Sequence, residues 1–168
     1  MRADLIVEQA LADALGPTPA EPILAPAVSP PLEFTHALGL DLILEGFLAH
    51  HGRPRDLVLD DPSALVLAGD YCYAAGLVRV AQANDVFVIG ALARLVALSS
   101  GLVATGRRVE LPNVWLGTAT AITRASDPRM QERFGAAIRS STEAADPAGF
   151  DQLAAELKNP PDLESVFA

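Results

Sequence analysis

Two long, nearly uncharged segments limit what this chain can fold into. Residues 62–82 and 85–104 consist mainly of Ala, Leu and Val, with few charged side chains between them. Both segments are longer than ordinary strands and neither alternates apolar with polar residues, so each is predicted to be a helix that packs on several sides. Of all residues 51% are hydrophobic but only 5% are aromatic, which favours closely packed helices over a sheet. We therefore expect an all-α fold with no sheet.

Three Asp-Pro dipeptides indicate where helices begin. They are Asp61-Pro62, Asp127-Pro128 and Asp146-Pro147. An Asp side chain can cap the first N–H groups of a helix, and proline is favoured at the first helical position because it needs no hydrogen-bond partner there. Asn84 or Asp85 is expected to cap the helix that follows. Together with the apolar periodicity, these signals predict about six to seven helices, at residues 3–15, 32–50, 62–82, 85–104, 112–125, 128–142 and 147–158.

A cluster of six prolines lies between residues 17 and 31. Proline fixes φ and lacks an N–H donor, so this segment is predicted to be an extended arm rather than a regular helix. Within it, Ile23, Leu24 and Val28 are expected to lie along an apolar groove. The chain is thus divided into an N-terminal helix (1–16), the proline-rich arm (17–31), a helical domain (32–138) and a C-terminal extension (139–168).

The net charge limits the kinds of binding partner to expect, and the cysteine content bears on the cellular compartment. The net charge is −9 and Lys158 is the only lysine, so the chain lacks the basic surface that nucleic-acid binding requires. The single cysteine, Cys72, excludes an internal disulfide and is expected to be a buried, inert thiol, which fits a cytoplasmic protein. The most apolar run, 86–104, carries Arg94 near its middle and is predicted to be a core helix rather than a membrane span. Peripheral membrane association stays open.

A motif in the centre of the chain suggests a family. Gly52-Arg53-Pro54 precedes Leu67-Ala68-Gly69-Asp70-Tyr71. This arrangement resembles the isoprenyl diphosphate synthases of the polyprenyl synthetase family, in which an Arg-Gly-x-Pro element precedes a helix marked Leu-x-Gly-Asp-Tyr. The resemblance covers about residues 32–138 and is specific at 51–73. It implies a partial, degenerate version of that family's helical bundle, because the family enzymes are roughly twice as long.

The residues that hold magnesium in the resembled family are incomplete here. The family's Asp-Asp-x-x-Asp motif falls on the segment from Asp41 to Glu45, where the second acid is leucine. A competing alignment, through the family's Glu-x-x-His, places the motif two residues later and leaves no acid pair. The second aspartate-rich motif of the family is absent. We therefore expect no resident cofactor, with Asp41 and Glu45 as weak candidates for Mg²⁺; as bare sequence such a pair is more often a solvated helix face.

The residues that hold diphosphates in the family are also replaced. Its paired arginines correspond to His50 and His51, and neutral histidine cannot replace a guanidinium fork. Arg53 and Arg55 remain as weak candidates for a diphosphate, although ordinary loop arginines explain them equally well. The family's Lys-Thr pair corresponds to Gly117-Thr118. No catalytic residue is predicted, and any activity of the chain alone stays uncertain; the family's own activity is prenyl transfer.

These observations predict a non-catalytic subunit that forms a homo- or hetero-oligomer and stabilises or modulates another chain, which the resemblance suggests is a full-length polyprenyl diphosphate synthase. The interface is expected along the helices at 62–104. The glycines among its candidates suggest close helix approach, either between subunits or within the chain. The candidates are Leu65, Gly69, Tyr71, Tyr73, Gly76, Leu77 and Gly90.

Two other functions stay open. One is an accessory subunit of an unrelated, membrane-associated or soluble, complex, with the arm and the tail from residue 140 as docking elements. The other is a magnesium-dependent binder of isoprenoid diphosphates that uses Asp41, Glu45 and Asp70. Against the latter, Asp70 is expected to be a buried, hydrogen-bonded structural acid, given its apolar neighbours.

Overall fold

Helices account for all the regular structure that the computed structural model describes, which covers residues 21–28 and 32–168. The all-α prediction is therefore confirmed. The predicted helix at 3–15 lies outside the described residues. In chain order the helices are α2 (Ala25–Val28), α3 (Phe34–His51), α4 (Pro62–Ala81), α5 (Val86–Ala104), the 3-10 turn η1 (Arg108–Glu110), α6 (Leu111–Thr123), α7 (Pro128–Glu143), α8 (Ala148–Ala155) and α9 (Glu164–Phe167).

The Asp-Pro dipeptides cap helices as predicted. The carboxylate of Asp61 accepts a hydrogen bond from the Ser63 N–H, and that of Asp127 accepts one from the Arg129 N–H, both at 3.0 Å. Asp146 accepts one from the N–H of Ala148, again at 3.0 Å, but α8 begins at Ala148, one residue after the predicted start, and ends at Ala155, three residues before the predicted end. Each carboxylate therefore satisfies an N–H group that the helix itself leaves without a partner. Of the two residues proposed to cap α5, it is Asp85 whose carboxylate accepts from the third residue along, at 3.1 Å.

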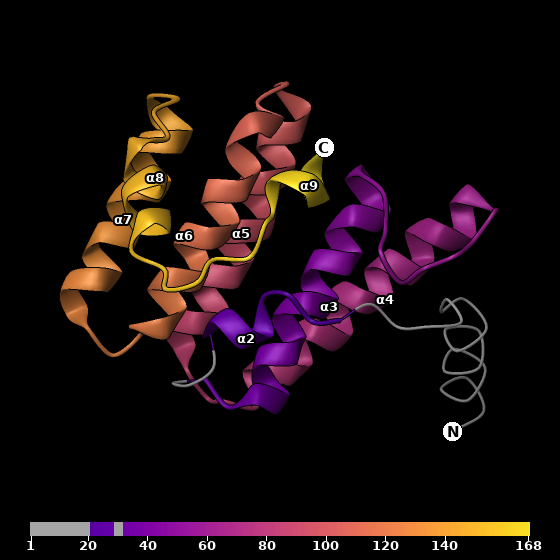
Figure 1. The fold of residues 1–168 in the computed structure, drawn as a ribbon, viewed down its shortest axis with the longest axis horizontal. Coiled ribbons are helices and arrows are strands. Elements are labelled where there is room, and N and C mark those ends of the chain that lie inside the picture. The colour runs from indigo at the N-terminus through magenta and orange to yellow at the C-terminus, as the bar shows by residue number, and fades with distance from the viewer. Residues whose placement is uncertain (1–20, 29–31) are drawn as a thin grey trace.

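α3 and α4 form an antiparallel pair that extends to one side of the molecule, away from α6, α7 and α8 (Figure 1). Glycines let the two helices approach closely. A Cβ atom on Gly76 would lie 2.6 Å from the carbonyl oxygen of Gly39, and one on Gly46 would lie 2.8 Å from that of Gly69. Real Cβ atoms do not come this close to other heavy atoms, so these positions require glycine. Small residues thus bring the two backbones together along their shared length.

The main core lies among α3, α5, α6, α7 and α8 and is centred on large buried side chains. These are Trp115, Phe47, Phe134 and Phe150. The C-terminal extension belongs to this core, because Phe150 and Leu153 of α8 and Leu163 beyond it are buried. Residues 140–168, which the sequence suggested as a docking element, thus pack apolar side chains inward.

The described part of the arm is also packed. Leu24 and Val28 are buried against the main core and Ile23 is partly buried, which confirms that this stretch lies along an apolar surface. One turn of helix, α2, forms at Ala25–Val28, where an extended conformation was expected. A single turn tolerates Pro26 because the N–H groups of a first turn have no partner within the helix.

Candidate functional site

The Asp41 carboxylate holds the arm against α3. It accepts three hydrogen bonds from consecutive main-chain N–H groups, from Ile23 at 2.7 Å, Leu24 at 3.1 Å and Ala25 at 2.8 Å. Oδ1 accepts two of these bonds and Oδ2 accepts one. A carboxylate offers about four acceptor positions. Three of them are therefore occupied by the backbone of the arm, and Asp41 is only 13% exposed.

Glu45, one turn further along α3, does the same for the loop after the helix. Its Oε1 accepts from the N–H groups of Asp56 at 2.7 Å and Leu57 at 2.9 Å, and its Oε2 accepts from that of Arg55 at 3.0 Å. Glu45 is 4% exposed, so these bonds compensate the burial of its charge. The expectation of a solvated acidic face is thus wrong for this pair. Over residues 21–28 and 32–168, no three His, Cys, Asp or Glu side chains are grouped so as to hold a metal ion.

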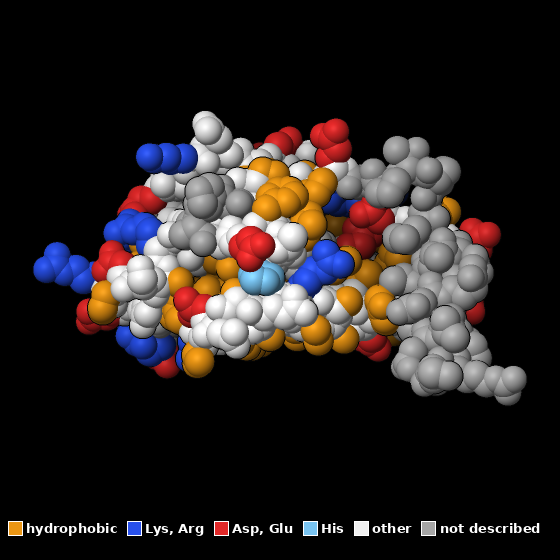
Figure 2. All heavy atoms as spheres, turned by 90° about the horizontal axis from the view of Figure 1, so that it is seen from below, with side chains coloured by type: hydrophobic (Ala, Val, Ile, Leu, Met, Phe, Trp, Pro, Cys, Tyr) orange, Lys and Arg blue, Asp and Glu red, His pale blue; other side chains and the backbone are white. Residues whose placement is uncertain are grey.

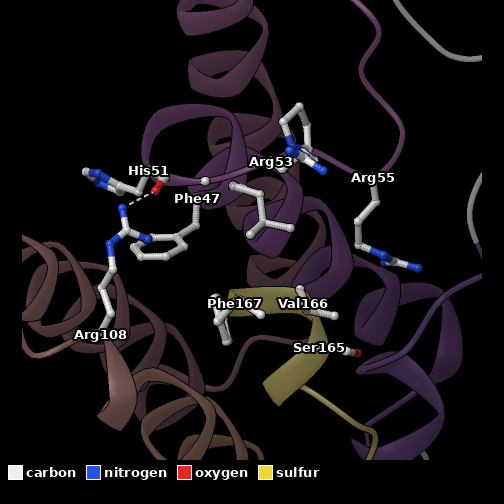
Figure 3. Close-up of a pocket in the computed structure, with 12 residues that line it drawn as sticks. Phe47, His51, Arg53, Arg55, Arg108, Ser165, Val166 and Phe167 are labelled. Atoms are coloured by element: carbon white, nitrogen blue, oxygen red, sulfur yellow. Dashed lines mark hydrogen bonds between the residues drawn. The ribbon is translucent and has the colours of Figure 1, made fainter.

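A cavity of about 640 Å³ lies at the C-terminal end of α3. The loop after α3 contributes Arg53 and Arg55, η1 contributes Arg108, and the C-terminal residues Ser165 to Ala168 form another wall (Figure 3). Phe47 of α3 and Phe167 of α9 are apolar parts of the lining, with their ring centroids 6.0 Å apart. Arg53 and Arg55, predicted as weak candidates for an anion, therefore do share a cavity. Arg108 was not predicted, because it lies 53 residues from the nearer of them in sequence.

The arginines of the cavity differ in their partners. Arg108 donates to the main-chain oxygen of His51. Arg55 donates to the main-chain oxygen of Glu21 at 2.6 Å and lies 4.0 Å from Asp41. Arg53 is exposed and has no hydrogen bond or ion pair with another described residue. Burial, followed by the nearby His50 and Arg108, lowers the pKa of His51, which favours the neutral form of this ring.

The Gly-Asp-Tyr residues lie on α4 beside the end of α3. Asp70 is 63% exposed, and its Oδ1 lies 3.1 Å from Nε2 of His50. The prediction of a buried Asp70 is therefore wrong: the residue lies exposed on the outward side of its helix. Tyr73 stacks on His50 with ring centroids 5.4 Å apart, and burial raises the pKa of its phenol. Asp70 does not join Asp41 and Glu45 in a common site.

The predicted interface residues divide into two groups. Gly69 and Gly76 are buried against α3, and Tyr73 stacks against it, so for these three the packing lies within the chain. Leu65 packs against a small buried cluster around Cys72. A Cβ on Gly90 would meet only the end of Arg94, at 3.9 Å, so close packing does not require glycine there. Tyr71 is partly exposed and Leu77 is exposed.

The outward face of α4 is more apolar than those candidates suggested. We define it as Val66, Leu67, Leu77 and Val78, which are 43%, 68%, 37% and 63% exposed. They are half of the large exposed hydrophobic residues in the described part of the chain. The spacing of these residues in the sequence indicates the shared face. The pair Val66 and Leu67 lies eleven residues, about three helical turns, before the pair Leu77 and Val78. The glycines drew attention to the opposite face.

The polar side chains are distributed unevenly over the surface. Charged groups of both signs gather at the end that carries α7 and α8, whereas hydrophobic groups reach the surface along one edge of the view in Figure 2. Arg124 and Arg133 both pair with Glu156 at that charged end. By length and composition, α4 and α5 of the described chain would each be able to cross a membrane, a test that core helices of soluble proteins also pass.

No family model, no curated protein and no solved structure matches this chain. The resemblance to the isoprenyl diphosphate synthases therefore depends on the motifs in residues 51–73 and on their spacing. What the fold establishes is the class, an all-α helical bundle.

Proposed function

We propose that this chain is a non-catalytic helical subunit that pairs with another protein chain through the outward face of α4. The observation that carries the proposal is the exposure of Val66, Leu67, Leu77 and Val78 on a helix whose other side is closely packed against α3. Apolar side chains concentrated on one element indicate an interaction surface, whereas single exposed ones are ordinary.

The shape of this face favours a helix as its partner. From Val66 to Val78 the stripe extends over twelve residues, about 18 Å of helix. Ala74 lies exposed between the two pairs of larger side chains and leaves space for an approaching helix. Ridges of one helix that fit grooves of another would cover such a stripe. The one charged residue on this side of α4 is Asp70, because Arg79 lies on the side towards α3, where a Cβ atom on Gly39 would be 3.2 Å from its own Cβ. Of the chain's net charge of −9, this face therefore carries a single carboxylate.

The resemblance suggests a full-length polyprenyl diphosphate synthase as the partner, and the test begins there. The chain would be co-expressed with such a synthase from the same genome, and the complexes measured by size-exclusion chromatography with light scattering. We expect a stoichiometric complex that Leu67→Glu together with Val78→Glu abolishes. Val109→Glu is the matched control, because Val109 is 87% exposed and lies off α4.

Three results would contradict all or part of this proposal. A complex that survives the α4 double variant would exclude the α4 face as the contact. A homodimer that the same variant dissociates would keep the face and replace the synthase by a second copy of this chain. A monomer that binds no synthase would refute the subunit function.

Peripheral attachment to a membrane is a second candidate, favoured by the apolar composition of α4 and α5. An exposed apolar helix face can insert into the boundary between headgroups and acyl chains. Against it, the face of α4 lacks the lysines and arginines that anionic lipids attract, since Arg79 is the one basic residue of that helix. Flotation with vesicles of neutral and anionic lipids separates the two functions, because a soluble protein complex would stay at the bottom of the gradient.

A further inference from the structure

The cavity between α3, η1 and α9 combines positive charge with an apolar floor. Arg53, Arg55 and Arg108 line it from two sides, and Phe47, Leu48 and Phe167 supply its apolar surface (Figure 3). Among the described residues that line it, none is an Asp or a Glu. This is unusual for a chain with 21 acidic and 12 basic residues, because a random sample of its surface would contain more carboxylates than guanidinium groups.

The charges in the cavity are only partly compensated. Arg108 bonds to a main-chain carbonyl, which accepts a hydrogen bond but leaves the positive charge in place. Arg55 has one carboxylate, that of Asp41, at 4.0 Å, but the same carboxylate already accepts three N–H groups. Arg53 has no ion-pair partner in the described chain. The side chains that line the cavity therefore carry more positive than negative charge, and Arg53 offers a guanidinium fork with free donors.

We propose that this cavity binds a small amphipathic anion, with a carboxylate or phosphate head at the arginines and a short apolar tail on the phenylalanine floor. Guanidinium groups bind both heads through paired N–H donors. A volume of about 640 Å³ falls within the range of small-ligand pockets, and the cavity combines the two kinds of lining, apolar side chains and polar groups, that such pockets use. The site is separate from the outward face of α4 and does not depend on it.

The only tryptophan of the chain provides a readout. Trp115 lies with its ring centroid 5.6 Å from that of Phe47 and 6.0 Å from that of Phe167, both of which line the cavity. A tail on these rings would change the surroundings of the indole. The purified full chain would be titrated with octanoate, octyl phosphate, octanol and inorganic phosphate, each below its micelle concentration, while Trp115 fluorescence and heat of binding are recorded.

The expected result is saturable binding of octanoate or octyl phosphate, with octanol and inorganic phosphate at least about tenfold weaker. The stronger of the first two identifies the head group. Arg53→Gln should lower the affinity for the two amphipathic anions by about tenfold, the effect of one lost charge-assisted contact, and leave the affinity for octanol unchanged. Arg129→Gln is the matched control, because it removes an exposed arginine of α7 outside the cavity.

Three outcomes would overturn the proposal. Equal binding of octanol would show that the arginines do not select an anion. If inorganic phosphate bound as tightly as octyl phosphate, the apolar floor would contribute nothing to binding. If Arg53→Gln and Arg129→Gln lowered the affinity for the anions equally, the effect would come from the net charge of the protein and not from the cavity. Since Arg53 has no described partner whose loss would destabilise the fold, its variant is expected to unfold at the same urea concentration as the parent.

Discussion

A single methyl group added at Gly76 tests the close packing of α3 on α4. The new Cβ would lie 2.6 Å from the carbonyl oxygen of Gly39 and 2.7 Å from Cγ1 of Ile43. The first of these atoms belongs to the main chain, so no side-chain rotation relieves the contact and the helices must move apart. Overpacking of this kind costs about 1–3 kcal/mol. Against it stands the higher helix propensity of alanine, about 1 kcal/mol.

A second variant removes the propensity term from the comparison. Gly101 lies inside α5, and a Cβ atom added there would have nothing within 4 Å, so Gly101→Ala should gain the propensity without a clash. The difference between the two variants is then the packing cost alone, about 1–3 kcal/mol. Urea unfolding followed by circular dichroism would measure it. With a slope near 2 kcal/mol per molar, the midpoints should differ by about 0.5–1.5 M. Equal midpoints would refute the close approach of the two helices.

Three further predictions concern buried or paired groups. Asp41→Asn removes a charged acceptor from the N–H groups of residues 23–25. We expect it to lower the free energy of unfolding by about 1.5–3 kcal/mol in urea and to speed hydrogen exchange at those three residues. Unchanged exchange would contradict the capping of the arm by Asp41. Burial, followed by the nearby Glu45 and Asp56, raises the pKa of Cys72 to about 11. Iodoacetamide at pH 8 should therefore modify this thiol far more slowly in the folded protein than in urea-unfolded protein. Equal rates would show that the thiol is exposed to solvent. The hydrogen bond from Arg133, with nearby Arg124, lowers the pKa of Glu156 below its ordinary value of 4.5. The contribution of Glu156 to stability is therefore present above that value and is lost as the pH falls through the lower folded pKa. In urea unfolding, parent and Glu156→Gln should differ at pH 7 and converge in acid, whereas a difference that stays constant with pH would exclude the ion pair as its cause.

The sequence predicted the helices well because their ends carry local signals. Asp61 and Asp127 each cap the helix that begins at the next residue, so the predicted starts are correct to the residue. Gly106 ends α5 in the left-handed region, with φ 74°, and the N–H of Arg107 bonds back to the oxygen of Leu102 at 2.8 Å. Such signals involve neighbours in sequence and need no knowledge of the tertiary fold.

The direction in which each helix face points could not be predicted in the same way. α4 is apolar on both sides, so periodicity does not distinguish the side that packs on α3 from the side that faces outward. The glycines pointed to close packing but left its partner open, and the structure places Gly69 and Gly76 within the chain. Arg108 joins the cavity through contacts distant in sequence, which no local pattern records.

The acids at the position of the family's first metal motif show how this scaffold differs from a metal-binding one. Asp41 and Glu45 together accept six main-chain N–H bonds, and these bonds fix the arm and the loop at successive turns on one face of α3. A cation that took both carboxylates as full ligands would have to displace those donors, at about 1–3 kcal/mol for each N–H left buried without a partner. Gly117, at the position of the family's lysine, lies under α8, where even a Cβ would be 3.0 Å from the ring of Phe150. A lysine there would push α8 off the core. At each of these positions the residue present serves packing or capping, which is the physical basis for proposing a subunit that assembles rather than one that catalyses.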